Sequence, residues 1–592
     1  MTERRRNPCE LEIDLFCHGV RIDPSCTLFE DARKLTRTRA GLGSGLELIL
    51  PGPLKEIWMN APVEEDFVRT SPYLLVKRDG GYAVRDERSA HEYAVRIPVE
   101  PAWYTRHTSR GTEMCKVGVL QGTYLGVYIA NSCLFWYSDP PMNCRFCTTG
   151  SNVGVNEVAQ KDVEDVVEVA LAAKRDSGVT FVHLNSGHQA GRDLAVAEPY
   201  VRALKERVGV LVGVQLMPSK DLAGYDRLID LGVDHFSFCY EFHNPLYFER
   251  YLPGKQRWFG QQVFFDALEY TAKRLGKGAV SGEIIAGVEP VEDTIRAIDY
   301  ITSVGAFPTV CVFRPVIGAQ MEGHPSPKYE EMLGIFKHVY EACRRNGIPI
   351  GAAPNIEVSL VVQPDDTRYL AKRSLATWLY ESRLALVRRA ARPIFAKKMR
   401  AEPRTVSASA PLDPERSTPI GKPNGNGANG GNGGNGHGAP AAPPCDAAHA
   451  PRPPAPVAAA GPDDAARREA AMERVFAMLR DATSTVAGPF ALEERPAILE
   501  VVPKNVLRDA ENRCRLKLFR PREDKDRLCA FFYKRSNLSW SRDRFSYGAV
   551  EFLPEDVTSA DFETWLSWLR DGFDPARRPP RLRRAFLYTI PE

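Results

Sequence analysis

The spacing of apolar positions changes period repeatedly between about residues 117 and 360. A helical spacing, in which apolar side chains recur three or four positions apart, alternates with short and nearly continuous apolar runs. KDVEDVVEVALAAKRDSG, residues 161–178, shows the helical spacing and ends in Gly178, a typical helix stop. Its apolar positions are Val163, Val166, Val167, Ala170 and Leu171. The run TFVHL follows and is typical of a buried strand.

The same pair of patterns recurs along this segment. Strands are predicted in a run that begins near Leu125 and in TFVHLN, VLVGVQ, VDHFSFCYE, AVSGEIIAG and PTVCVF, with a candidate seventh in IPIGAAP at residues 348–354. Helix–strand units of this length need right-handed crossovers and a parallel sheet. We therefore predict an α/β fold in which residues 106–402 form a partial (β/α)6-type TIM-like barrel with a C-terminal helix. Chemistry in such a barrel belongs at the carboxyl ends of the strands.

The flanking segments show other patterns. Residues 1–105 contain short β-prone runs and turns, including a hairpin in YLLVKRDGGYAVRDE, and predict a β-rich N-terminal domain. Residues 403–468 combine Gly/Asn repeats with a Pro/Ala tract, a composition that predicts a disordered linker. Residues 469–592 mix two helical patterns with strand-like runs such as LCAFFYKRS and RAFLYTI, so we predict a small α+β C-terminal domain.

Composition narrows the class of protein. The chain has 592 residues, of which 44% are apolar and 26% charged, as in ordinary globular proteins of two to four domains. A formal net charge of +3 does not indicate nucleic acid or an anionic membrane as a partner. No apolar run approaches the roughly 18 residues that a membrane span needs. The arginines at the start are not followed by an apolar run, so we do not expect a secretory signal. We therefore expect a cytoplasmic protein without a membrane or nucleic-acid partner.

The chain contains thirteen cysteines, a number that fits a reducing compartment. Three of them, Cys133, Cys144 and Cys147, lie in NSCLFWYSDPPMNCRFCTTG, directly after the first predicted barrel strand. Thiolates bind zinc or iron–sulfur clusters. Structural zinc takes four ligands, and Cys115 or His107 would supply the fourth. A four-iron cluster held by three cysteines leaves one iron open for another ligand.

The other cysteines carry weaker signals. Cys239 and Cys311 lie inside apolar strand-like runs, where core packing is the expected role. Cys9, Cys17 and Cys26 are loosely spaced near the N-terminus, and a second metal site there stays an open alternative.

A cysteine triplet that ends in Cys-x-aromatic-Cys, placed after the first strand of a (β/α)6-type barrel, resembles the radical S-adenosylmethionine (SAM) superfamily. The spacing here is C-x10-C-x2-C, whereas the usual spacing in the superfamily is C-x3-C-x2-C, so the first gap departs from the pattern. LPGK at 252–255 and SGEIIAGVE at 281–289 are similar to segments of the biotin synthase and hydrogenase-maturase branch. The resemblance covers roughly residues 117–360.

The resemblance implies a [4Fe-4S] cluster held by Cys133, Cys144 and Cys147, with Phe146 beside the cofactor. SAM would occupy the open iron. Reductive cleavage of SAM would give a 5′-deoxyadenosyl radical, which would abstract a hydrogen atom from a small-molecule or peptide substrate. An electron donor such as ferredoxin or flavodoxin is also implied.

The same resemblance implies further contacts to SAM. Glu241, at the end of the fourth strand, would bind the ribose hydroxyls, and Arg257 would pair with the methionine carboxylate, with Arg250 and Arg314 as alternatives. The methionine amino group would meet the end of the second strand, where His188 stands in place of the family's Glu. That segment comprises Asn185, Ser186, Gly187 and His188.

Two features of the function stay open on the sequence alone. The branch includes sulfur insertion, carbon–carbon cleavage and rearrangement, and the residues do not choose among them. The alternative to radical chemistry is a zinc- or iron–sulfur-stabilised barrel with a binding or scaffold role. The long linker suggests that the C-terminal domain delivers or recruits a partner.

Overall fold

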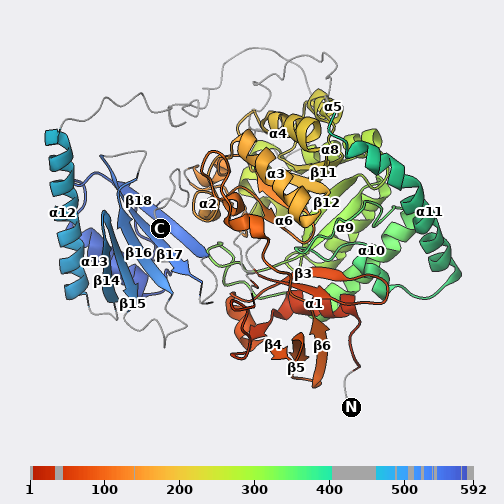
Figure 1. Cartoon of the computed structure of the whole chain (residues 1–592), viewed down its shortest axis with the longest axis horizontal. Coiled ribbons are helices and arrows are strands. Elements are labelled where there is room, and N and C mark those ends of the chain that lie inside the picture. The colour runs from red at the N-terminus through yellow and green to blue at the C-terminus, as the bar shows by residue number, and fades with distance from the viewer. Residues whose placement is uncertain are drawn as a thin grey trace, which may run out of the picture.

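The computed structural model shows an N-terminal segment, a central α/β half-barrel and a C-terminal sheet covered by helices (Figure 1). The predicted linker lies outside the described residues as far as 461, and so does the predicted strand RAFLYTI. The structure describes residues 4–31, 33, 45–138, 140–402, 462–486, 490–503, 513–521, 526–536, 538, 543–574 and 577–582. Within them no helix is long and apolar enough to cross a membrane.

A seven-stranded sheet in the order β13-β12-β11-β10-β9-β8-β7 forms the centre of the molecule. Neighbours from β8 to β13 pair in parallel, whereas β7 (Val119–Leu120) pairs antiparallel with β8. The predicted partial barrel is therefore confirmed. The parallel strands are β8 (Leu125–Tyr128), β9 (Phe181–Asn185), β10 (Leu211–Gln215), β11 (His235–Glu241), β12 (Val280–Ala286) and β13 (Phe307–Val312).

The predicted seventh strand at residues 348–354 is wrong. These residues form turns, because Pro349, Gly351 and Pro354 interrupt any ladder of backbone hydrogen bonds. The seventh strand is instead β7, which extends the opposite edge of the sheet.

Helices connect the strands and cover the outside of the curved sheet (Figure 1). The predicted helix of residues 161–178 is α3 (Val163–Ser177), in which Asp162 caps the first turn and Gly178 ends the helix with a left-handed backbone, φ 66°. The others are α2 (Thr149–Asn152), α4 (Glu198–Ala203), α5 (Leu222–Leu231), α6 (Pro245–Tyr251), α7 (Pro253–Trp258), α8 (Gln261–Leu275), α9 (Val291–Ser303), α10 (Tyr329–Asn346) and α11 (Leu375–Lys398).

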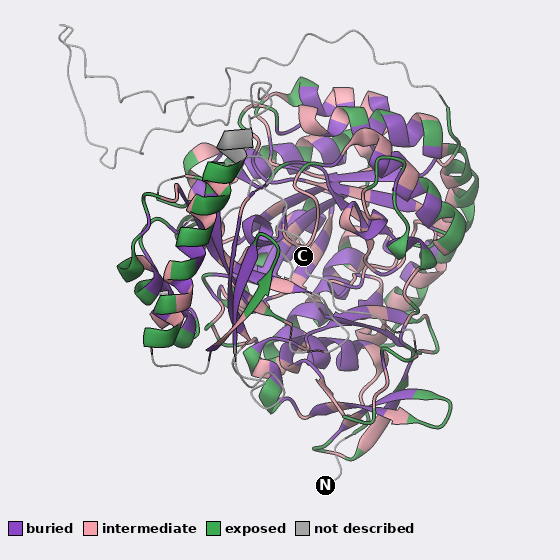
Figure 2. Ribbon diagram, turned by 60° about the vertical axis from the view of Figure 1, so that its left-hand side comes forward, coloured by how far each residue is buried: buried purple, intermediate pink, exposed green. Residues whose placement is uncertain are grey.

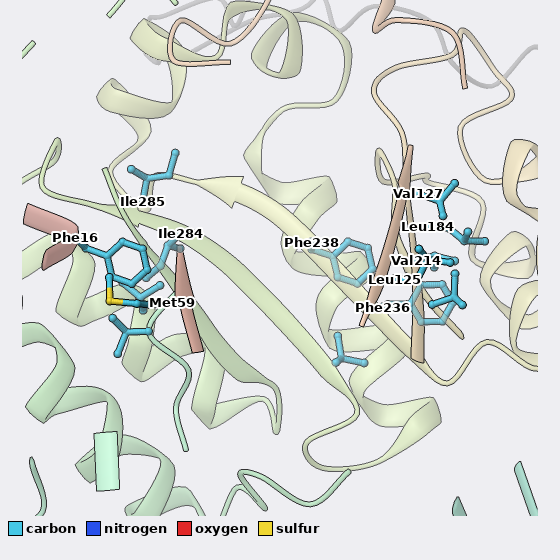
Figure 3. Close-up of a cluster of buried hydrophobic side chains, with 14 of the residues drawn as sticks. Phe16, Met59, Leu125, Val127, Leu184, Val214, Phe236, Phe238, Ile284 and Ile285 are labelled. Carbon is cyan, nitrogen blue, oxygen red and sulfur yellow. The ribbon is translucent and has the colours of Figure 1, made fainter. Parts of the chain in front are cut away.

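The two faces of the curved sheet differ in chemistry. In β9, Val182 and Leu184 are fully buried in the apolar core, whereas His183 and Asn185 line an interior cavity. Because side chains alternate along a strand, each strand contributes to both faces. Figure 3 shows the apolar set, which includes Leu125, Val127, Leu184, Val214, Phe236 and Phe238. The strands are largely buried, and exposed residues concentrate on the outer helices (Figure 2).

The N-terminal segment contains a helix that the sequence reading omitted. This helix, α1 (Pro8–His18), begins with a capping box between Asn7 and Glu10 and has Pro8 at its start. The predicted hairpin is confirmed, since β4 and β5 join at Asp79 and Gly80. The strands are β1 (Arg21–Ile22), β2 (Leu46–Leu50), β3 (Ile57–Ala61), β4 (Tyr73–Arg78), β5 (Gly81–Asp86) and β6 (His91–Val95).

The N-terminal segment shares its core with the half-barrel. Phe16 of α1 and Met59 of β3 lie in the same apolar cluster as Ile284 and Ile285 of β12 (Figure 3). The core is therefore continuous from α1 into the barrel.

The C-terminal part is an antiparallel five-stranded sheet in the order β14-β15-β16-β17-β18, with α12 and α13 on one face. The predicted α+β character is confirmed. Its helix α12 begins at Pro462, inside the range predicted for the linker. The elements are α12 (Pro462–Thr485), β14 (Phe490–Arg495), β15 (Ile498–Pro503), β16 (Cys514–Phe519), β17 (Leu528–Arg535), β18 (Arg544–Phe552) and α13 (Ser559–Arg570).

Candidate active site at the carboxyl edge of the half-barrel

The loop after β8 carries the three predicted cluster ligands. Cys133 is buried, and Cys144 and Cys147 are partly buried. Burial raises the pKa of all three thiols, to about 12 for Cys133. The charge of Cys147 further raises the pKa of both Cys133 and Cys144, so the three thiols influence one another electrostatically.

Backbone groups hold this site together. The Cys133 sulfur accepts the backbone N–H of His188 at 3.3 Å, and the Cys147 sulfur accepts that of Thr149 at 3.4 Å. Hydrogen bonds of this kind stabilise negative charge on sulfur. Gly187 lies so close that a β-carbon there would approach the Cβ of Cys133 to 2.3 Å. Only glycine therefore allows the end of β9 to lie against the first cysteine.

Three thiols are donors of the kind that bind iron–sulfur clusters or zinc. A tetrahedral ion draws four ligands onto one centre, whereas a four-iron cluster distributes its thiolates over different irons. No three His, Cys, Asp or Glu side chains in the described part of the chain are grouped to hold one metal ion. The proposed fourth zinc ligands lie elsewhere: Cys115 lines the interior cavity, and His107 is bridged to Glu113.

The predicted SAM segment at the end of β9 lies beside the cysteine loop. The backbone N–H of Ser186 donates to the Gln215 carbonyl at 3.1 Å, and that of Gly187 donates to the Tyr128 hydroxyl at 2.9 Å. Asn185 lines the cavity. This segment therefore joins the cysteine loop to the interior of the half-barrel.

The His188 ring packs against the cysteine loop and pairs with Asp193. Its Nδ1 lies 3.1 Å from both carboxylate oxygens of Asp193, and the ring stacks on Phe135 at a centroid distance of 4.8 Å. Its backbone serves the loop, since the His188 carbonyl accepts the N–H of Leu134 at 3.1 Å. The predicted contact of His188 with SAM stays a prediction.

Glu241 stands at the end of β11 in a strained conformation. The register of β11 shifts between Cys239 and Glu241, and Glu241 has a left-handed φ of 57°. Such a backbone costs about 1–3 kcal/mol and is concentrated at functional sites. Both carboxylate oxygens accept hydrogen bonds from Lys255, at 2.7 and 2.6 Å. Burial raises the pKa of Glu241 to about 7, although the positive charge and hydrogen bonds of Lys255 lower it.

Lys255 is a site residue that the sequence reading missed. Although burial alone would lower it, the pKa of Lys255 is raised, because Glu241 and nearby thiols attract its charge. Its Nζ also donates to the Cys239 carbonyl at 2.6 Å. Gly254, the residue before it, donates its N–H to the Met142 carbonyl at 2.9 Å. The LPGK segment thus contacts the cysteine loop. The similarity of this segment to a segment of the resembled family was the sequence signal that could have identified Lys255.

The remaining predicted residues surround this site. Phe146 lies edge-on to Phe242, with ring centroids 6.1 Å apart. Arg257 is exposed on α7, and its Nη1 lies 3.9 Å from the Met142 sulfur on the cysteine loop. Of the two alternatives, Arg314 donates to the Asn60 carbonyl at 2.6 Å, toward the N-terminal segment.

Arg250, the second alternative, has its guanidinium carbon 5.3 Å from the centre of the Tyr251 ring. The role of an arginine toward a carboxylate stays a prediction.

A cavity of about 1030 Å³ runs along the inner face of the sheet. Glu283 of β12 accepts hydrogen bonds there from Ser237 at 2.6 Å and from Gln215 at 2.6 Å, and from the Cys239 thiol at 2.9 Å. Cys311 packs against the core as expected, although it also lines the cavity, whereas Cys239 is only partly buried and its thiol bonds to Glu283. The polar residues at alternate positions of the strands were the sequence signal that could have predicted this polar inner face.

Two histidines in the cavity are neutral at physiological pH. Burial lowers the pKa of His183 to about 3, with a further decrease from His235, and burial lowers that of His235 to about 4. Neither side chain therefore adds positive charge to the barrel interior.

The N-terminal cysteines serve packing. Cys9 and Cys17 are buried on α1, and the Cys26 thiol donates to the Leu75 carbonyl at 3.3 Å. None of the three belongs to a metal-binding group among the residues that the structure describes.

The chain is similar to several known proteins. No family model matches the chain. It is similar to bacteriochlorophyllide c C-7(1)-hydroxylase of Chlorobaculum limnaeum, with 23% identity over 306 residues that cover 48% of this chain and 75% of the relative.

Three solved structures are also similar. Methylornithine synthase (PylB) has a TM-score of 0.28 at 18% identity, covering 44% of this chain and 78% of its own. HydG, a maturase of the [FeFe]-hydrogenase, has a TM-score of 0.30 at 15% identity, covering 39% and 51%. TsrM from Kitasatospora setae, a radical S-adenosylmethionine methyltransferase with tryptophan and a SAM analogue bound, has a TM-score of 0.29 at 12% identity, covering 53% and 72%.

The cysteine loop lies at the carboxyl edge of a parallel half-barrel, the edge at which TIM-like barrels carry their catalytic groups. The sequence relative supports the predicted resemblance to radical SAM enzymes, which at 23% identity stays a resemblance. The sequence relative is an enzyme, and the cofactors that the resemblance implies for this chain are a [4Fe-4S] cluster and SAM.

Proposed function

We propose that the protein cleaves SAM reductively at a [4Fe-4S] cluster bound by Cys133, Cys144 and Cys147, and abstracts a hydrogen atom from a substrate in the half-barrel cavity. One observation supports the proposal: the loop after β8 carries three cysteines at the carboxyl edge, and the first of them, Cys133, lies against the end of β9. A cluster with three thiolates, when bound, supplies the electron for SAM cleavage and one iron open to SAM.

The chain's own residues would perform the remaining tasks. The backbone N–H groups of His188 and Thr149 stabilise charge on two of the sulfurs. Lys255 fixes the Glu241 carboxylate at the same edge of the sheet, where we propose that Glu241 accepts hydrogen bonds from the ribose hydroxyls. Since both side chains are buried, water competes little for these contacts.

The cavity suits a substrate that is shielded from water. Its volume is about 1030 Å³, within reach of sites for small molecules. Gln215 and Glu283 supply polar groups on the inner face of the strands. These groups would orient a substrate, while the apolar outer face of the sheet keeps the strands rigid.

We further propose a small electron-transfer protein such as ferredoxin or flavodoxin as the electron donor, and a reducing cytoplasmic setting. No disulfide links the cysteines of the described residues, which supports a reducing compartment.

The proposal is tested by anaerobic reconstitution with iron and sulfide, followed by assay of 5′-deoxyadenosine in the presence of a strong reductant and SAM. The wild-type protein is expected to bind about four irons and form 5′-deoxyadenosine. Cys144→Ala is expected to abolish both, because it removes a ligand. Cys343→Ala, a matched loss of a buried cysteine on α10 away from the cavity, is expected to retain both. A colourless wild-type protein that binds zinc and forms no 5′-deoxyadenosine would refute the proposal.

A further inference from the structure

Helix α11 attaches to the half-barrel through one side. Tyr380 and Leu384 are buried on that side. The Tyr380 hydroxyl donates to the Ile348 carbonyl at 2.5 Å, and the centre of its ring lies 5.9 Å from that of Tyr340 on α10. Figure 1 shows α11 along the periphery of the half-barrel, so the opposite side of the helix faces outward.

The outward side of α11 is apolar. Four of its large side chains are exposed, Leu375 to 73%, Trp378 to 63%, Leu379 to 54% and Leu386 to 70%, and none of these lines the interior cavity. They recur three, four and seven positions apart, which places them on one stripe of the helix. Among the described side chains, no other helix has more than one large apolar residue exposed to this degree. A contiguous exposed apolar stripe marks an interaction site, whereas single exposed leucines are ordinary.

Cations surround the apolar stripe. The single acid within residues 372–400 is Glu381, which pairs with Arg368 at 2.5 Å. Two cations, Arg388 and Lys398, are neutralised by acids of the barrel at 2.9 and 3.1 Å. The other cations of this segment are exposed, and no acid of the described residues pairs with them. They are Lys372, Arg373, Arg383, Arg389, Arg392, Lys397 and Arg400.

The helix lies at the amino ends of the barrel strands, away from the cysteine loop. Phe395 of α11 and Met399 after it pack against Tyr124, Phe181 and Leu211, which stand at the starts of β8, β9 and β10. The cysteines lie at the carboxyl edge of the same sheet. An electron-transfer protein has to approach the cluster, so the surface of α11 does not suit an electron donor.

The charge of α11 also limits the choice among the remaining partners. A second copy of this chain, paired through the same stripe, would bring exposed cations next to exposed cations, and such like-charge contacts are costly. An anionic lipid surface satisfies both features of the helix. Leucine and tryptophan side chains insert at the boundary between headgroups and acyl chains, while arginine and lysine reach the lipid phosphates.

We propose that the outward side of α11 binds the surface of an anionic lipid bilayer. The helix lies in the plane of the interface, because no helix of the described residues is long and apolar enough to cross a membrane. The formal net charge of +3 for the whole chain does not indicate this partner, since the cations are concentrated in one helix. Val387, Ala391 and Phe395 of the same helix line the interior cavity, so the proposed lipid surface and the cavity share α11.

The test is co-sedimentation of the full-length, cluster-loaded protein with lipid vesicles. One set of vesicles contains equal parts of phosphatidylglycerol and phosphatidylcholine, and the other contains phosphatidylcholine alone. The wild type is expected to bind the anionic vesicles at least about tenfold more tightly than the neutral ones, because several exposed cations lie on one helix. The measurement needs no SAM, so its result is independent of the proposed radical chemistry.

Two variants separate the apolar contribution from the ionic one. Leu386→Gln is expected to weaken binding to the anionic vesicles by about tenfold, the effect of one leucine side chain that is no longer buried. Arg389→Gln is expected to weaken it by about fivefold, the effect of one cation near an anionic surface. Both side chains are exposed, and circular dichroism confirms that each variant is folded.

Each variant has a matched control on another helix. Leu246→Gln removes a leucine on α6 that is 72% exposed, and Lys273→Gln removes an exposed cation on α8. Either substitution is expected to change vesicle binding by less than about twofold, since neither residue belongs to α11.

Three results would overturn the proposal. The first is a wild type that does not bind the anionic vesicles. The second is binding that Arg389→Gln weakens and Leu386→Gln leaves unchanged, which would indicate an acidic protein as the partner. The third is a dimer in sedimentation velocity that Leu386→Gln dissociates, without vesicle binding, which would indicate a second copy of the chain.

Discussion

At the scale of single residues, the site depends on charges that have no access to bulk water. Glu241 occupies a left-handed backbone at the end of β11, and Lys255 donates to both of its oxygens. Buried ion pairs add little net stability when intact, but loss of one partner leaves an uncompensated charge. The pair therefore positions a carboxylate at the carboxyl edge of the sheet.

This arrangement predicts a marked asymmetry between single and double substitutions. Lys255→Met is expected to destabilise the half-barrel by about 3 kcal/mol, because Glu241 stays buried without its partner. The double variant Lys255→Met/Glu241→Gln is expected to recover most of that loss, since no buried charge is then left. Urea unfolding followed by fluorescence measures both. Equal destabilisation by the single and the double variant would contradict a buried ion pair.

The contact between Gly187 and Cys133 makes a second prediction. In Gly187→Ala the added β-carbon would lie 2.3 Å from the Cβ of Cys133, so the cysteine must move. We expect iron bound after reconstitution to decrease by about tenfold, because cluster sites tolerate little displacement of a ligand.

The matched control for this substitution is Gly81→Ala. A β-carbon at Gly81 meets nothing within 4 Å, so iron binding should stay at the wild-type level. Circular dichroism reports whether either protein is unfolded. Full iron binding by a folded Gly187→Ala protein would show that the position of Cys133 is not critical.

At the scale of elements, one carboxylate links two strand ends. Glu289, after β12, accepts the backbone N–H groups of His243 and Asn244, which follow β11, at 3.2 and 2.9 Å. Burial raises the pKa of Glu289 to about 7, although these two N–H groups oppose the shift. The carboxyl edge is therefore sensitive to the protonation of a residue that does not itself belong to the cysteine loop.

The sign of the resulting pH dependence follows from linkage. The pKa of Glu289 rises from 4.5 to about 7 on folding, so the folded protein binds the proton more tightly between these values. The stabilisation is present below the lower value and is lost as the pH rises through the higher one. Glu289→Gln cannot titrate. We expect its melting temperature, relative to the wild type, to increase between about pH 5 and about pH 8. A constant difference would show that Glu289 titrates normally.

The sequence predicted the elements of the half-barrel well, because its strands and helices have clear periods. α3, with Asp162 and Gly178 at its ends, is an example. The N-terminal helix α1 was missed because its capping box lies among β-prone runs and carries the buried acids Glu12 and Asp14 on an otherwise apolar pattern.

The site was only partly predictable for a related reason. The three cysteines have a distinctive spacing, whereas Lys255 acquires its role from the fold of the loop that brings it to Glu241. The contact of the C-terminal domain with the barrel depends on docking between distant segments, as Asn156 and Arg544 illustrate. Local periodicity contains no information about such contacts.

At the scale of the whole molecule, the cavity has lining residues from both the half-barrel and the C-terminal sheet, so its shape depends on how the C-terminal domain is held. Besides the Asn156 contact, Glu322 of the barrel accepts hydrogen bonds from the Tyr547 hydroxyl at 2.9 and 2.8 Å and lies 3.4 Å from Lys534. Glu64 of the N-terminal segment pairs with Arg513 at 2.5 Å. The C-terminal domain therefore contacts both other parts of the chain, through polar bonds that surround an apolar contact.

This docking predicts a local effect of substitution at Glu322. Glu322→Ala is expected to accelerate amide hydrogen exchange in β18 by about tenfold, because Tyr547 and Lys534 lose their acceptor. Glu331→Ala, whose partner Lys328 is exposed, should leave that exchange unchanged. Hydrogen exchange followed by mass spectrometry measures both variants. Unchanged protection of β18 in Glu322→Ala would show that the domain is held by other contacts.

The central claim is that three thiolates leave one iron of a cluster open and that SAM binds there. Electron–nuclear double resonance on the reduced protein, with an isotope label at the amino nitrogen of SAM, tests it most directly. We predict a coupling between that nitrogen and the cluster, retained in Cys343→Ala. A reduced cluster with no coupling to bound SAM, or with a fourth cysteine in place of the open position, would contradict the claim.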